Sequence, residues 1–337
     1  MVVALVFSVL TAVVGVSARF VSLPYDSLGP GTARAVNSVL SIEGHPSYPP
    51  RGQLLYTTVS VRERVNPYEA LAGWLDPDVD VIPERTVRGD VPPDVFKQQN
   101  IEAMADSKTT AELLALRHLG YHDLGGGAEI LSVDESLPAA PLLRPKDVIV
   151  EVDGQPVATS DEAGAAIRAH QPGDVIGLKL IRDGEATVDL QAPLGAGEGG
   201  RPLLGVRLTT KIELPFEINI DSGKVTGPSA GLAYALELLD VLTPGELTGG
   251  GPVAVTGDLQ PDGTVGPIGG VAQKAVTVRQ AGVKVFLVPK ENVAEAETHS
   301  DGKLEIHGVG SFDDALRVLG SLDGSNALAL GQPGAGT

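Results

Sequence analysis

The feature that most constrains the fold of this chain is a regular alternation of apolar strands and helices over residues 203–320. Strands are predicted at GVRLTT, FEINI, PVAVTGDL and KVFLVP, and helices after Ser229, after Gly270 and near residues 311–319. Such an alternation builds a sheet that helices cover. The sequence therefore predicts an α/β or α+β domain in this part of the chain.

The composition limits what the chain can bind. Its 337 residues carry a formal net charge of −18, whereas nucleic acids and anionic lipid surfaces require faces rich in lysine and arginine. The chain contains no cysteine, which excludes disulfides and thiolate metal sites. We predict no nucleic-acid partner, no metal ion and no cofactor.

The N-terminus is the most apolar part of the sequence. The first 18 residues, MVVALVFSVLTAVVGVSA, contain no charged side chain, and a bilayer core needs roughly 20 such residues. We predict a membrane helix over residues 1–23 that makes the protein a single-pass protein of the cell membrane, with its body outside the cytoplasm. The alternatives are a cleavable signal peptide that ends at Val16-Ser17-Ala18 and a buried core helix.

Between these two regions the chain contains several segments that differ in composition and in predicted secondary structure. Residues 24–55 are rich in Pro, Gly and Ser and predict an extended lead, QLLYTTVSVRERV predicts a strand over 53–65, and residues 94–120 have a mostly helical pattern. The strand over 53–65 belongs either to this lead or to the sheet of the last domain. The predicted domains are the membrane segment 1–23, the lead, strand and helical segment 24–118, a compact β-rich unit 119–194, a linker 195–202, the alternating domain 203–325 and a disordered tail 326–337.

The compact unit resembles PDZ domains of bacterial proteases. The resemblance rests on ILSVDESLPAAPLLRPKDVIVEVDGQPV, followed by a helix and by PGDVIGLKLIRDG. It implies that an extended peptide, often a C-terminus, adds as a strand beside the helix, with its carboxylate on the backbone amides of a short loop. We expect this loop at Leu119, Gly120 and Tyr121, with residues 125–127 as the competing position. A small β-domain without a ligand is the other interpretation.

Ser229 lies in GKVTGPSAGLAYALELL, directly before a helical apolar pattern. At a helix N-terminus, free N–H groups and the positive end of the helix dipole would stabilise an oxyanion. Serine is also a preferred N-cap, so this stretch alone favours a simple helix cap. A nucleophilic serine needs a base to accept its proton, and no histidine follows it in a suitable context.

Lys274 is the candidate base. It follows Gly269-Gly270 and lies one turn into a helix whose other residues are mostly small or apolar, without an acidic neighbour in the nearby sequence. Burial without a carboxylate partner would lower the pKa of this lysine and let it accept a proton. The alternative is an ordinary solvated lysine.

Together, GPSAGLAYALELL, LTGGGPVAVTGDLQPDGTVGPIGGVAQKAV and AGVKVFLVPKEN are similar to the proteolytic domain of Lon-type Ser-Lys peptidases, over residues 212–292. The resemblance implies Ser229 as nucleophile, Lys274 as general base and Thr256 as a residue that orients the lysine. The backbone N–H groups of Ser229 and Ala230 would form the oxyanion hole. A ring of identical subunits is suggested by the family only.

The chain departs from the ATP-dependent members in two ways. Thr226 stands where they usually have an acidic residue, and no G-x-x-x-x-G-K-[ST] motif occurs. The whole chain resembles the bacterial membrane-anchored, PDZ-containing Lon-like proteases, an α+β multidomain architecture. We predict an ATP-independent serine endopeptidase that cleaves unfolded or exposed segments of protein and peptide substrates selected by the PDZ domain. The rival hypothesis is a membrane-tethered peptide-binding adaptor with an inactive Lon-like domain.

Overall fold

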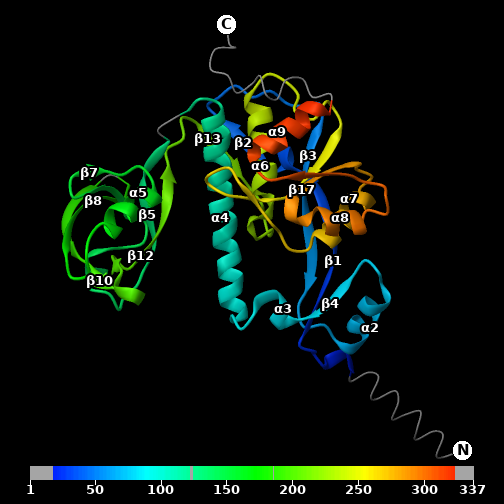
Figure 1. Ribbon diagram of the computed structural model, residues 1–337, viewed down its shortest axis with the longest axis horizontal. Helices are drawn as coiled ribbons and strands as arrows, with labels where there is room; N and C mark the ends of the chain where they lie inside the picture. The colour runs from blue at the N-terminus through cyan, green and yellow to red at the C-terminus, as the bar shows by residue number, and fades with distance from the viewer. Residues whose placement is uncertain (1–17, 122–123, 185, 323–337) are drawn as a thin grey trace, which may run out of the picture. The chain divides into compact units, whose positions relative to one another are not determined.

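The computed structural model describes residues 18–121, 124–184 and 186–322, and they form two compact units (Figure 1). The larger unit contains the chain up to Gly120 and from Ile218 onward, and the smaller unit runs from Tyr121 to Glu217. The smaller unit is therefore an insertion within the chain of the larger one.

A six-stranded mixed sheet organises the larger unit. Its four parallel strands are β18, β17, β14 and β3, whereas β1 runs antiparallel to both β3 and β4. In spatial order the strands are β18 (Glu305–Val309), β17 (Val285–Pro289), β14 (Pro252–Val255), β3 (Gln53–Arg62), β1 (Tyr25–Ala35) and β4 (Asp80–Pro83).

Both faces of this sheet are covered by helices, because successive side chains of a strand point to opposite faces. Leu54 and Tyr56 of β3 pack with α6 and α9, whereas Leu55 packs with α7 and α8. The α-helices of the larger unit are α2 (Pro67–Leu75), α3 (Glu84–Arg88), α4 (Pro93–His118), α6 (Gly231–Leu242), α7 (Val271–Gln280), α8 (Val293–Thr298) and α9 (Phe312–Ser321).

Short elements complete the larger unit. Two further strand pairs occur, β2 with β13 and β15 with β16. The short strands and 3-10 turns of the larger unit are η1 (Ala18–Phe20), η2 (Val36–Ser38), β2 (Leu40–Glu43), β13 (Glu217–Ile220), η5 (Pro228–Ala230), β15 (Asp258–Leu259), β16 (Val265–Gly266) and η6 (Lys290–Asn292).

Strand β1 lies in the segment that the sequence predicted as an extended lead. Its residues Gly29-Pro30-Gly31 fall at an irregularity in the pairing with β3, between Pro30 and Ala33. A Cβ on residue 31 would lie 2.3 Å from the carbonyl oxygen of Thr58, so only glycine allows this close approach. The glycines and proline that suggested a lead are therefore accommodated inside a sheet.

The smaller unit is an antiparallel sheet with one helix. The helix, α5 (Ser160–Arg168), begins where Thr159 Oγ1 accepts a hydrogen bond from the N–H of Glu162 at 3.2 Å. In spatial order the strands are β12 (Val206–Ile212), β5 (Gly125–Val133), β6 (Val148–Val152), β8 (Val175–Arg182) and β9 (Ala186–Pro193), with β7 (Gln155–Pro156) beside β6. The remaining elements are η3 (Ala140–Leu142), β10 (Gly195–Ala196), η4 (Glu198–Gly200) and β11 (Pro202–Leu203).

The C-terminal end of this unit differs from the expected boundaries. Residues 203–217, which we placed in the alternating domain, lie in the smaller unit because β12 pairs with β5 through the partners Leu208 and Ile130. The expected linker 195–202 contains β10 and the first residue of β11, which pair with each other. Strand pairing, which local composition does not encode, sets this boundary.

The predicted fold class and localisation require one correction. Both included an N-terminal membrane helix, but no helix within residues 18–121, 124–184 and 186–322 is long and apolar enough to cross a bilayer. Within the predicted segment 1–23, the described part holds only the short turn η1. Residues 1–17, and the tail 326–337 predicted as disordered, lie outside the described residues.

Candidate functional site

The segment around Ser229 is a tight turn that leads into a buried helix. Gly227 has a φ of 92°, a backbone conformation that favours glycine, and Pro228 follows at the first position of the 3-10 turn η5. Helix α6 then begins at Gly231. Ser229 therefore lies at the N-terminal end of η5 and α6, where the first N–H groups lack helical partners.

Lys274 reaches this turn from helix α7. Its Nζ lies 2.7 Å from Ser229 Oγ and 2.9 Å from Thr256 Oγ1. The lysine is 3% exposed, and burial lowers its pKa to about 7 because the charged form loses its water. Within the described part of the chain it forms no ion pair with a carboxylate. The lysine can therefore lose its proton near neutral pH.

Thr256 links the lysine to the serine backbone. It follows β14 and is fully buried, accepts a hydrogen bond from Lys274, and donates from Oγ1 to the carbonyl oxygen of Ser229 at 3.0 Å. The N–H of Gly257 donates to the same carbonyl at 2.9 Å. These two bonds fix the carbonyl side of Ser229 against the end of β14.

The two interpretations of Ser229 can be compared with this geometry. Its Oγ accepts a hydrogen bond from Lys274, and no side-chain capping bond is present at the start of either η5 or α6. Ala230, whose N–H we assigned to the oxyanion hole with that of Ser229, lies in the same turn and is buried. Thr226, the departure from the family pattern, is exposed. The structure thus brings Ser229, Lys274 and Thr256 together.

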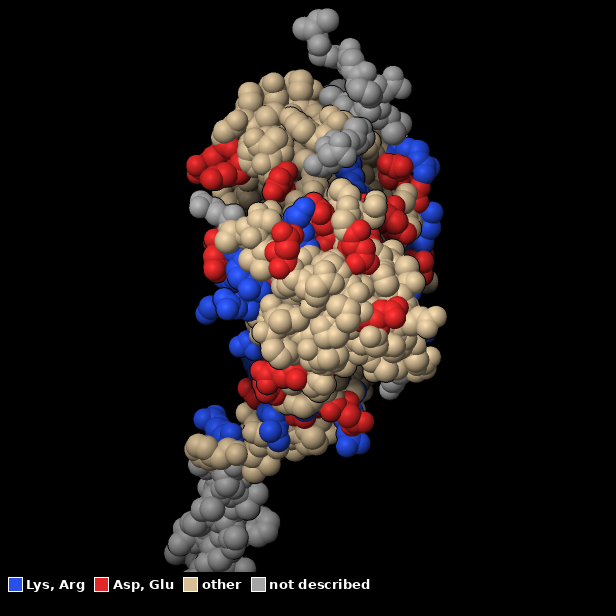
Figure 2. Space-filling model, turned by 90° about the vertical axis from the view of Figure 1, so that its left-hand side faces the viewer, with Lys and Arg blue, Asp and Glu red and all other residues tan. Residues whose placement is uncertain are grey.

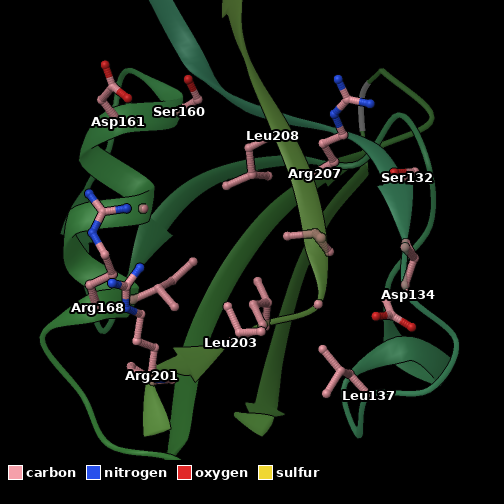
Figure 3. A pocket seen from close by; sticks show the side chains of 17 residues that line it. Ser132, Asp134, Leu137, Ser160, Asp161, Arg168, Arg201, Leu203, Arg207 and Leu208 are labelled. Carbon is pink, nitrogen blue, oxygen red and sulfur yellow. The ribbon is translucent and has the colours of Figure 1, made fainter. Parts of the chain in front are cut away.

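A second candidate site is a cavity of about 680 Å³ in the smaller unit (Figure 3). One wall is helix α5, from Ser160 to Arg168, and the opposite wall is Arg201–Leu208, which leads into β12. The end of β5 and the following turn complete the lining. Strand β12 is the edge of its sheet, because within the described residues only β5 pairs with it. An extended peptide could therefore pair with β12 next to α5.

Charged side chains line this cavity on both sides. Arg168 and Arg201 extend next to each other at one end, whereas Asp161 lies at the far end of α5, and Arg207 and Asp134 lie on the side opposite this helix (Figure 3). Leu203 and Leu208 supply apolar surface between the two ends. Neither Arg168 nor Arg201 forms an ion pair with a described carboxylate. The arginine end is therefore suited to a negatively charged group.

The residues that we expected to form the peptide-binding loop do not line this cavity. Leu119 and Gly120 end the α4 segment of the larger unit, Tyr121 opens the smaller one, and none of them lines the cavity. The competing residues 125–127 begin β5 and do not line it either. Residues 201–206, RPLLGV, line the cavity but were not among the residues expected from the sequence, and Gly205 there has a φ of 83°.

Comparisons with known proteins find two family models, one mainly in each unit. The family model described as the Lon protease (S16) C-terminal proteolytic domain matches residues 215–320, and the PDZ domain model matches residues 105–191. The chain therefore contains a Lon-type proteolytic domain and a PDZ domain, which supports a serine protease.

Several curated relatives are similar over part of their length. Lon protease 1 of Hydrogenovibrio crunogenus is 37% identical over 46% of this chain and 22% of its own length. Lon protease of Haemophilus influenzae is 31% identical over 38% of this chain and 16% of its own length. The chain thus spans less than a quarter of each of these relatives. The solved PDZ domain of the SdrC-like protein of Listeria monocytogenes is 28% identical, with a TM-score of 0.24, over 26% of this chain and 90% of its own.

Proposed function

We propose that the chain is a serine endopeptidase in which Ser229 is the nucleophile and Lys274 the general base. The observation that carries the proposal is a buried lysine with a pKa of about 7 whose Nζ lies 2.7 Å from the serine oxygen. Burying an ammonium ion costs several kcal/mol unless it is paired or neutral. A buried lysine that has no carboxylate partner among the described residues and lies beside a serine is therefore suited to proton transfer.

The geometry supports a two-step reaction. Neutral Lys274 accepts the proton of Ser229 Oγ as this oxygen attacks the peptide carbonyl, and the tetrahedral oxyanion forms beside the N–H groups of Ser229 and Ala230. The Lys274 ammonium then returns the proton to the leaving amine, which leaves an acyl-enzyme. The same lysine activates a water molecule that hydrolyses the ester. Thr256 holds Nζ in place through its hydrogen bond.

The proposal includes cleavage without ATP, since the 337 residues contain no P-loop motif to couple hydrolysis to unfolding. The substrates would then be unfolded proteins or exposed segments. The smaller unit would select them by pairing an extended peptide with β12, with an acidic group at Arg168 and Arg201. The contact between Lys274 and Ser229 favours this function over a peptide-binding adaptor, because an adaptor gains nothing from a desolvated lysine.

The test is cleavage of a fluorescently labelled unfolded protein by Ser229→Ala and Lys274→Met. Each substitution is expected to lower kcat/KM by about 10³-fold or more, because the residues act as a unit. Lys224→Ala is a matched control, since Lys224 is exposed in the same segment before Ser229. Full cleavage by either variant would show that the assigned nucleophile or base is incorrect.

A serine-directed phosphonate separates the peptidase from the adaptor. The wild-type protein should be labelled at Ser229, and Lys274→Met should be labelled much more slowly. An adaptor with an inactive site would bind peptides but would not react with the reagent.

A further inference from the structure

Helix α4 contacts the turn that carries Ser229 at two points. Ser107 Oγ donates to the carbonyl oxygen of Pro228 at 2.9 Å, and the N–H of Gly227 donates to the carbonyl oxygen of Asn100 at 3.1 Å. Both contacts involve the two residues immediately before Ser229. Ser107 therefore holds the carbonyl of Pro228, and Thr256 and Gly257 hold the next carbonyl, that of Ser229.

Ser107 occupies an unusual position for a polar residue. It is 3% exposed and shares the buried face of α4 with Met104 and Ala111. A serine within a helix commonly donates to a carbonyl one turn earlier in its own helix. Here the hydroxyl donates to a residue 121 positions away. A Cβ on residue 231 would lie 2.4 Å from Ser107 Oγ, so Gly231 is required for the approach.

The hydrogen bond from Ser107 to the Pro228 carbonyl also affects the N–H group of Ser229. The carbonyl of Pro228 and the N–H of Ser229 belong to one planar trans peptide, in which they point in opposite directions. A hydrogen bond that holds the carbonyl toward α4 therefore fixes the direction of the Ser229 N–H. The N–H of Gly231 also donates to this carbonyl, within η5. Ser107 supplies the constraint from outside the turn.

We infer that Ser107 is a positioning residue that aligns the Ser229 N–H with the oxyanion of the tetrahedral intermediate. The inference rests on the proposed peptidase function and adds a residue that touches neither the substrate nor Lys274. Because the oxyanion exists only in the transition state and intermediate, Ser107 should affect kcat much more than KM.

The experiment compares Ser107→Ala and Ser107→Cys in the full chain. Both remove the strong donor, and the thiol of the second variant keeps most of the volume of the side chain while donating only weakly. Loss of one oxyanion donor costs about 10²–10³-fold in kcat, so loss of its alignment is expected to cost about tenfold. KM should stay within about twofold of the wild-type value.

A peptide boronate provides the decisive second readout, because its tetrahedral adduct places an oxygen in the oxyanion hole. Its affinity should fall by about the same factor as kcat, while the midpoint of the pH–rate profile, set by Lys274, stays unchanged. Thr110→Ala is the control for helix destabilisation, since Thr110 is also buried on α4. It should change stability without changing boronate affinity.

Two results would overturn the inference. In the first, a folded Ser107→Cys variant has the kcat and boronate affinity of the wild type. In the second, activity falls only in proportion to the unfolded fraction, as in Thr110→Ala. Ser229→Ala is measured in parallel, because cleavage that survives this substitution refutes the proposed function itself and not only the role of Ser107.

Discussion

The two units of this protein treat charge in opposite ways. In the larger unit the cation of the proposed active site is Lys274, which is 3% exposed and has no carboxylate partner within the described residues. In the smaller unit the cations of the proposed peptide site are Arg168 and Arg201, which are exposed at one end of an open cavity. Figure 2 shows acidic and basic side chains exposed on one face of the molecule, and Lys274 is not among such surface groups.

The difference teaches what each kind of charge can do. Removal of water changes the pKa of a lysine and turns it into a base, so the larger unit is suited to chemistry. An arginine that keeps its water remains charged at all working pH values and can attract an anion reversibly, so the smaller unit is suited to recognition. Changes in pH and salt should therefore separate the two units.

The largest expected effect is the pH dependence of cleavage. Because Lys274 must be neutral to accept the proton, kcat/KM should rise about tenfold per pH unit below a midpoint near pH 7 and level off above it. Peptide affinity for the smaller unit should stay flat over the same range. Initial rates and fluorescence anisotropy measure the two quantities. A midpoint near the ordinary lysine value of 10.5 would remove the contrast between the units.

A smaller effect, on peptide binding, is expected from substitution of Arg168 and Arg201 in the cavity. Arg168→Gln and Arg201→Gln should each weaken binding of a peptide with a free C-terminal carboxylate by about fivefold, since exposed charge pairs contribute up to about 1 kcal/mol. Raising the salt from about 0.1 to about 0.5 M should weaken wild-type binding in the same sense. The measurement is fluorescence anisotropy with full-length Ser229→Ala protein, so that the peptide is not cleaved.

Two controls sharpen this prediction. Arg144→Gln changes an exposed arginine of the same unit that does not line the cavity, and it should leave affinity unchanged. A peptide with an amidated C-terminus should respond weakly to the arginine substitutions. Equal affinity of the free and amidated peptides for every variant would exclude carboxylate recognition at the end of the cavity that carries Arg168 and Arg201.

The smallest effect concerns a buried carboxyl that the reaction does not use. Glu237 of α6 is 1% exposed, both its oxygens lack partners among the described residues, and burial raises its pKa to about 8. Between pH 4.5 and 8 the folded state therefore binds more protons than the unfolded state, so stability falls as the pH rises.

Glu237→Gln should remove this dependence. Between about pH 6 and about pH 8, the free energy of unfolding should decrease by about 2 kcal/mol less in the variant than in the wild type. Urea unfolding at the two pH values measures the difference. Identical pH slopes would mean that Glu237 is hydrated in the folded protein, and the larger unit would then not exclude water as uniformly as its Lys274 requires.

The candidate residues of the larger unit could be predicted because local sequence carries their surroundings. A Gly-Pro-Ser turn before a helix, and a lysine placed after two glycines on an apolar helix, describe most of the environment of Ser229 and Lys274. The sequence could not give their separation of 2.7 Å, because it depends on how η5 and α7, which are distant in sequence, meet at Thr256. Their catalytic roles remain predictions.

Other features depend on pairing between distant segments and escaped prediction. The cavity beside α5 is completed by Arg201–Leu208. This segment joins the smaller unit through the pairing of β12 with β5. Strand β1 was missed because Gly29 and Gly31 weaken its local pattern, although the close approach to β3 requires Gly31. Ser107 was missed because a single serine within a 26-residue helix has no distinguishing neighbours.

Because the smaller unit is inserted within the chain of the larger one, paired strands of the larger unit are translated at well-separated times. Strand β3 pairs with β14 through Leu54 and Val253, which are about 200 residues apart in sequence. At about 5–20 residues per second, the second strand is synthesised on the order of ten seconds or more after the first. Lys274 is made later still. The nascent chain therefore cannot assemble the contact between Lys274 and Ser229 until the chain has been translated past Lys274.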